Sequence, residues 1–260
     1  MLGKLIKYEL KATARTLIPL YIVLLMFALI NKLFMGTDNN INMDLLGGIP
    51  VMISMFAYGC TMAAVFIITF FVIVQRFYKN LLGDEGYLMN TLPVPTWMNI
   101  SSKLGVSVIW SIVSGIVAIL SVIIMAYSQD MFKDLLDNFA KITSYLPQEY
   151  YGVGLEIILY VFVSMIASTL MLYLSISTGH LFNKRRILAS FGAFIVLNMI
   201  INAVQAIIQG IAFMANESSI MANETKFMGM IHVFLGCEIL LAIVFFIGCN
   251  YIIKNKLNLE

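Results

Sequence analysis

Polar side chains that could bind a ligand or take part in chemistry recur inside the most apolar stretches of this 260-residue sequence. Four amides follow one another at spacings of four, three and four residues: Asn198, Asn202, Gln205 and Gln209. This spacing places them on one face of a helix. Amides both donate and accept hydrogen bonds, so this face suits a path for a polar or peptide-like substrate. It suits equally well a subunit interface in which amides bond helices together, and the sequence leaves both open.

A carboxyl group interrupts the last apolar stretch. Glu238 lies nine residues after Gly229, where that stretch begins. At about 1.5 Å per helical residue, this position is near the middle of a membrane span. An ionised carboxylate is costly there, so we expect it to be protonated, paired or facing water. Glu238 is therefore either a contact for a cationic substrate or proton, or a hydrogen-bonded structural acid.

The composition indicates which environment these polar groups occupy. Hydrophobic residues make up 61% of the chain and charged residues 12%, and the mean hydropathy is +0.93. Water-soluble domains have about a quarter of their residues charged. A chain this apolar cannot cover itself with polar surface, which predicts an all-α integral membrane protein. The net charge of +2 is too small to favour a nucleic-acid partner.

Six stretches are long enough to cross the bilayer as helices. A span needs about 20 mainly apolar residues. The predicted spans are 17–34, 49–74, 104–127, 153–181, 187–214 and 229–253. We expect residues 1–260 to form a single transmembrane domain. In the third span, a stripe of small residues is typical of close helix packing: Ser107, Ser111, Ser114 and Ser121.

The distribution of charge predicts the orientation of these spans. Lysine and arginine gather before the first span, in the connections 75–103 and 182–186, and in the tail. The other connections are mainly acidic. Because basic residues near span ends are retained on the inner side, both termini are expected in the cytoplasm.

The segment before the first span, residues 1–16, has an amphipathic pattern. Its apolar side holds Leu2, Leu5, Ile6 and Leu10. Its opposite side is basic, with Lys4, Lys7, Lys11 and Arg15. This predicts an interfacial helix whose cations face anionic head groups of the inner leaflet. It acts either as an orientation anchor or as an elbow that steers the first span and contacts a cytoplasmic partner.

The connection 75–103 is long, and its composition is distinctive. Gly83 and Gly86 permit a turn around Asp84 and Glu85, and the prolines that follow prevent a continuous helix. The pattern predicts a short helix, acidic at its start and apolar on one side, with the form of a docking knob. From the residues alone, an ordinary surface loop stays open as the alternative.

The run RFYKNLLGDEGYL at 76–88, followed by TLPV at 91–94, resembles a known family. It is similar to the connection between the second and third spans in the membrane subunits (permeases) of type-2 ATP-binding-cassette (ABC) transporters, mostly exporters. The basic start and the six-span layout are similar too, so the resemblance covers nearly the whole chain. It implies a coupling helix that seats in a cytoplasmic ATPase, through Asp84, Glu85, Gly86, Tyr87 and Leu88.

The resemblance also implies partners and a location. A separate ABC ATPase subunit would bind ATP and Mg²⁺, and a second permease, either a copy or a relative, would complete a dimer in a bacterial cell membrane. The chain itself has no G-x-x-x-x-G-K-[ST] phosphate loop, no HExxH zinc motif and no G-x-S-x-G motif. We therefore expect no enzymatic activity, no cofactor and no metal site in this chain.

Two other functional classes stay open. An ion-coupled secondary transporter would use Glu238 as its coupling group. A non-transporting membrane sensor or scaffold would need only the helices and the basic segments. One departure from the smallest family members is the longer outer connection, 128–152, whose pattern predicts an amphipathic helix. The substrate and the choice between homodimer and heterodimer stay open.

Overall fold

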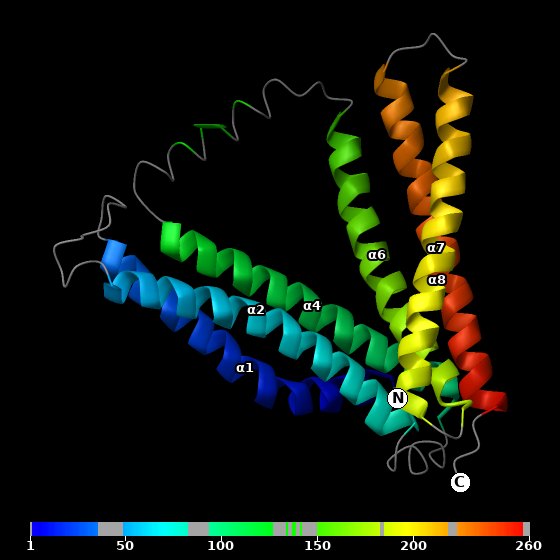
Figure 1. Cartoon of the computed structure of the whole chain (residues 1–260), viewed down its shortest axis with the longest axis horizontal. Coiled ribbons are helices and arrows are strands. Elements are labelled where there is room, and N and C mark those ends of the chain that lie inside the picture. Colours follow the sequence, from blue (N-terminus) through cyan, green and yellow to red (C-terminus); the bar gives the residue numbers. More distant parts are fainter. Residues whose placement is uncertain are drawn as a thin grey trace. The chain divides into compact units, whose positions relative to one another are not determined.

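The structure is a computed structural model, shown in Figure 1. It describes residues 2–35, 49–82, 94–126, 134, 137–138, 141, 150–182, 185–217 and 223–256. Throughout these ranges the regular structure is helical, and they contain no strand. The five residues Asp84, Glu85, Gly86, Tyr87 and Leu88, together with most of the outer connection 128–152, lie outside the described residues.

Within the described ranges, six helices are long and apolar enough to cross a membrane, in agreement with the predicted all-helical class and with the six predicted apolar stretches. Their bounds are α1 Leu2–Met35, α2 Ile49–Phe77, α4 Thr96–Ala126, α6 Tyr150–Gly179, α7 Arg186–Glu217 and α8 Asn223–Asn255. A single π-helical turn, η2 (Tyr78–Leu82), continues α2.

The helix boundaries follow local chemistry more than hydropathy. Helix α2 begins at the predicted Ile49, whereas α4 begins at Thr96, before the predicted span start at residue 104. Proline disfavours helix in the residue before it, so α4 starts only after Pro95, whose carbonyl accepts from the Met98 N–H at 2.9 Å. Helix α1 contains both the expected interfacial segment and the first span without a break, and the interfacial position of residues 1–16 stays a prediction.

By their contacts, the residues form two compact units. Unit 1 contains Met1–Gln75 and Gly105–Pro147, and here α1, α2 and α4 lie side by side (Figure 1). Its buried core is built from apolar and aromatic residues of these three helices: Leu17, Tyr21, Leu24, Ala28, Tyr58, Val65, Val106 and Trp110.

Buried hydroxyl groups join the helices of unit 1. Ser114 lies within hydrogen-bond distance of both the Tyr21 hydroxyl (2.7 Å) and the Thr69 hydroxyl (2.9 Å). Ser121 is 2.9 Å from the Tyr58 hydroxyl. Both serines are almost fully buried, so these members of the serine stripe serve helix packing.

Unit 2 contains Arg76–Leu104 and Gln148–Glu260. In this unit α6 packs against both α7 and α8 (Figure 1). At the end of α2, the Phe77 ring stacks on the Tyr173 ring of α6, with centroids 3.9 Å apart and planes 6° from parallel. Both rings are fully buried, so the start of the connection is anchored on α6.

The turn from α6 to α7 is tight. A Cβ on Gly179 would overlap the backbone of Ser190, so only glycine fits at this position. Arg185, just before α7, has a positive φ of 68°. That conformation is unfavourable for a residue with a Cβ.

Candidate functional site: a cavity in unit 2

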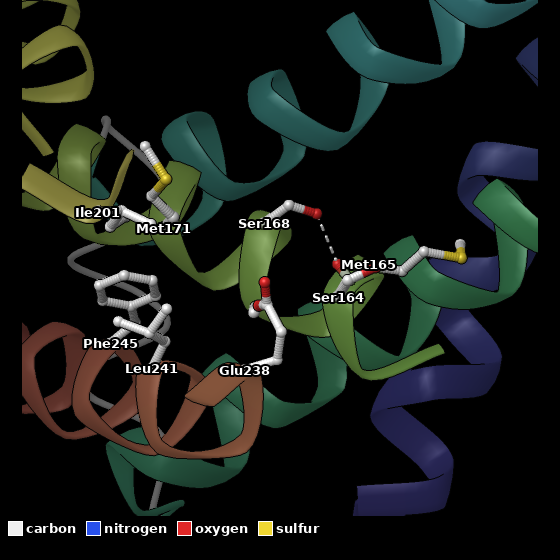
Figure 2. Close-up of a pocket in the computed structure, with 9 residues that line it drawn as sticks. Ser164, Met165, Ser168, Met171, Ile201, Glu238, Leu241 and Phe245 are labelled. Atoms are coloured by element: carbon white, nitrogen blue, oxygen red, sulfur yellow. Dashed lines mark hydrogen bonds between the residues drawn. The ribbon is translucent and has the colours of Figure 1, made fainter. Parts of the chain in front are cut away.

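The α6–α8 region of unit 2 contains a cavity of about 280 Å³ (Figure 2). Its lining combines one carboxyl group and two hydroxyl groups with apolar side chains: Ser164, Met165, Ala167, Ser168, Met171, Ile201, Glu238, Leu241 and Phe245. Helices α6 and α8 contribute most of the wall, and Ile201 comes from α7.

The polar groups of the cavity come from α6 and α8. Figure 2 shows the Glu238 carboxyl directed toward the part of α6 that carries Ser164 and Ser168. The two serines are four residues apart, which puts them on the same face of α6. Their hydroxyls donate to their own helix, Ser164 to the Val161 carbonyl at 2.9 Å and Ser168 to the Met165 carbonyl at 3.0 Å. The serine oxygens therefore keep lone pairs for a ligand.

Glu238 is held by one of the four predicted amides. The Gln205 Nε2 donates to Glu238 Oε1 at 3.1 Å, which joins α7 to α8 inside the predicted membrane region. Both side chains are half-buried. The hydrogen bond fixes the carboxyl and leaves its other oxygen for the cavity.

The four amides do not converge on one site. Asn198 donates to the Phe194 carbonyl of its own helix at 3.3 Å. Asn202 and Gln209 are exposed, and they lie on a helix whose most apolar stretch buries no residue within the described chain. Of the predicted face, only Gln205 reaches Glu238.

Sequence reasoning proposed Gln205 and Glu238 separately but missed their pairing, and it also missed the serines of α6. The signal for the serines was present as a pair four residues apart in a predicted span. Nothing in the sequence showed which way α6 turns, so the pair could not be assigned to a cavity.

The region predicted to contact an ATPase is described only at its two flanks. Before it, Phe77 and Leu81 are fully buried, and Asn80 and Leu82 are nearly so. After it, in the first turns of α4, Ile100 is fully buried and Ser102 is nearly so. Both flanks belong to unit 2, together with α6, α7 and α8.

The basic side of the first helix is exposed, as an amphipathic helix requires. Lys4, Lys7, Lys11 and Arg15 are all exposed. On the opposite side, Ile6 and Leu10 pack against the core of unit 1. Thr13, also on this side, accepts a 2.6 Å hydrogen bond from the Trp110 indole.

The two histidines lie in different surroundings. His180, just after α6, is tilted against Tyr78 with ring centroids 5.0 Å apart. Burial lowers the pKa of His180, and the nearby Arg186 charge lowers it further. His232 on α8 pairs with Glu156 on α6 at 3.2 Å. Within the described ranges, no group of three or more His, Cys, Asp or Glu residues is placed to hold a metal ion.

Comparison of the chain with protein-family models, with curated proteins and with solved structures finds no match.

Proposed function

We propose that this chain is the membrane permease of a two-component ABC exporter. In this account two permeases form the substrate path in the cell membrane, with their termini in the cytoplasm. Separate ATPase chains bind ATP and Mg²⁺ and drive the transport cycle. The similarity of residues 76–94 to a coupling connection, together with the six apolar helices, supports this proposal.

The observation that carries the proposal is the burial of both flanks of that connection in unit 2. Phe77 is stacked on Tyr173, and Asn80, Leu81 and Leu82, which follow it in the same unit, are buried. A push on a segment with both ends anchored is passed to the helices that hold those ends. The connection is therefore built to transmit a partner's movement to α6, which packs on α7 and α8.

The exposed side of α7 suits a second permease. Asn202 and Gln209 are exposed in a span, where polar groups usually face protein or water. Since each amide both donates and accepts, the same face on a second copy is complementary to it. In the proposed dimer these amides lie between the two chains, where they bond the subunits or line the path.

A pull-down in mild detergent tests the ATPase partner. The tagged native chain is compared with the double variant Asp84→Lys, Glu85→Lys. We expect a P-loop ATPase to co-purify with the native chain and to be lost from the variant, because reversing two charges opposes the contact. The matched control is Glu217→Lys, Glu224→Lys, which makes the same charge change on the predicted outer side and should retain the ATPase.

Other outcomes of the pull-down distinguish an error in the position of the ATPase contact from failure of the exporter proposal. Recovery of the ATPase with both the native chain and the coupling variant would move the contact to another segment. If no P-loop ATPase is recovered with any of the three chains, the exporter proposal fails.

The Gln205–Glu238 hydrogen bond favours a second candidate function. A carboxyl held beside a cavity within a span is a feature of ion-coupled carriers, so a secondary transporter would couple an ion at Glu238. Transport that stops in Glu238→Gln, and that runs in proteoliposomes without any ATPase, would establish this candidate in place of the exporter.

A further inference from the structure

The side chains that line the cavity in unit 2 suit a cation better than an anion. The polar atoms of its lining residues carry negative or partial negative charge: the Glu238 carboxyl and the hydroxyl oxygens of Ser164 and Ser168. The Phe245 ring adds a face that attracts cations. None of the described residues that line the cavity is a lysine or an arginine.

The described donors beside the cavity point at protein groups. Gln205 directs one of its two N–H groups at Glu238 Oε1, and the serine hydroxyls donate to carbonyls of α6. An anionic ligand would find no cationic side chain among the described lining residues and would lie beside the Glu238 carboxyl. A ligand that carries a positive charge would meet the second carboxyl oxygen and the serine lone pairs.

The rest of the cavity lining is apolar and therefore favours a ligand with an apolar portion. Met165, Met171, Ile201, Leu241 and Phe245 form most of the surface. Methionine side chains adapt to different shapes, and aromatic and aliphatic groups favour hydrocarbon. The volume of about 280 Å³ is just below the roughly 300–1,000 Å³ found for ligand pockets, so the ligand is small.

We propose that the α6–α8 cavity binds a small hydrophobic monocation, with its ammonium group at Glu238 and its apolar body against Met171, Leu241 and Phe245. As a site for transport cargo this deepens the proposed exporter function and rests on it. As a binding site it stands independently, because it uses only residues of unit 2.

Binding is measured with the full chain in lipid nanodiscs, without any ATPase. The probe is radiolabelled benzyltrimethylammonium, and empty nanodiscs give the background. Unlabelled neopentylbenzene, which has the same shape without the charge, and phenylacetate serve as competitors. We expect saturable binding that unlabelled benzyltrimethylammonium displaces and that neither competitor displaces at matched concentration.

Variants assign this binding to the cavity. Glu238→Gln should weaken the affinity by roughly tenfold or more, because the amide has lost the charge that opposes the ammonium. Glu156→Gln removes a carboxylate of α6 that pairs with His232 and does not line the cavity, and it should leave the affinity unchanged. Ser164→Leu keeps Glu238 but fills the cavity, so it should also prevent binding. Gel filtration of each variant checks its fold.

Three results would overturn the proposal: no saturable binding, equal affinity in Glu238→Gln, or equal displacement by neopentylbenzene, which would mark the cavity as a hydrocarbon site. The pull-down distinguishes this failure from failure of the proposed function. If an ATPase co-purifies but the cation does not bind, the exporter proposal stands and the cavity site is rejected. If the cation binds but no ATPase co-purifies, the cavity site stands and the exporter proposal is rejected.

Discussion

At the scale of single residues, His180 is a group whose protonation opposes folding. Its ring lies against Tyr78, and its Nε2 is buried without a hydrogen-bond partner among the described residues. Burial, and then the charge of Arg186, lower its pKa from the ordinary value of 6.5. The unfolded chain therefore takes up the proton more readily than the folded chain, so protonation favours unfolding.

This predicts a loss of stability on acidification. The contribution of neutral His180 is complete above pH 6.5, the ordinary pKa, and falls as the pH drops from there toward the lowered pKa of the folded state. Thermal unfolding followed across this range should show a falling midpoint in the native chain. His180→Gln should flatten that dependence, whereas His232→Gln should keep it. An unchanged slope in His180→Gln would refute this role.

Ser114 is predicted to be the most important hydroxyl in unit 1. It bonds to Tyr21 and to Thr69, whereas Ser111 on the same helix is only half-buried. Interhelical hydrogen bonds in membrane proteins contribute about 0.6 kcal/mol each and up to about 1.7 kcal/mol, so Ser114→Ala should destabilise the chain by roughly 1–2 kcal/mol. Thermal unfolding in detergent measures this, with Ser111→Ala as the control expected to have little effect. Equal effects of the two variants would contradict this interpretation.

At the scale of elements, the turn between α6 and α7 depends on Gly179. Since an added Cβ would overlap the Ser190 backbone, Gly179→Ala must push the two helices apart. Overpacking of this kind costs about 1–3 kcal/mol. The matched control is Gly192→Ala, where a Cβ meets nothing within 4 Å. We expect a lower unfolding midpoint for Gly179→Ala alone, and similar midpoints for both variants would show that the close approach is not required.

The orientation of the helices is a second prediction at this scale. In a chain with Cys60, Cys237 and Cys249 replaced by alanine, single cysteines are placed by Glu217→Cys and by Lys256→Cys. The basic connections predict Glu217 outside and Lys256 inside. An impermeant maleimide should label the first variant in intact cells and the second only after permeabilisation. The opposite labelling pattern would show that the chain has the inverse of the predicted topology.

At the scale of the whole molecule, hydropathy was sufficient to predict the all-helical class and the six apolar helices found in the described residues. Length and apolar composition alone define a membrane helix, so Ile49 was predicted as the start of α2 and is observed there. Hydropathy placed the start of the third span at residue 104, whereas α4 begins at Thr96. This start depends on where Pro95 permits helix to begin, not on hydrophobicity.

The contacts between helices could not be predicted from the sequence. Thr13 and Trp110 are 97 residues apart, and Gln205 and Glu238 are 33 apart. Such pairs depend on how each helix is rotated about its axis, and a span that is apolar on all sides carries little information about that rotation. Of the four amides predicted to share a face, only Gln205 meets Glu238 in the described residues.

The central claim is that a separate ATPase drives this chain through the connection 75–103. The most direct test places a photo-crosslinking amino acid at Tyr87 in living cells, with Tyr151, in the predicted outer region, as the control. The account predicts that Tyr87 becomes linked to a protein with a G-x-x-x-x-G-K-[ST] motif and that Tyr151 does not. A Tyr87 variant that is inserted in the membrane but becomes linked to no such protein, or equal linking from Tyr151, would contradict it.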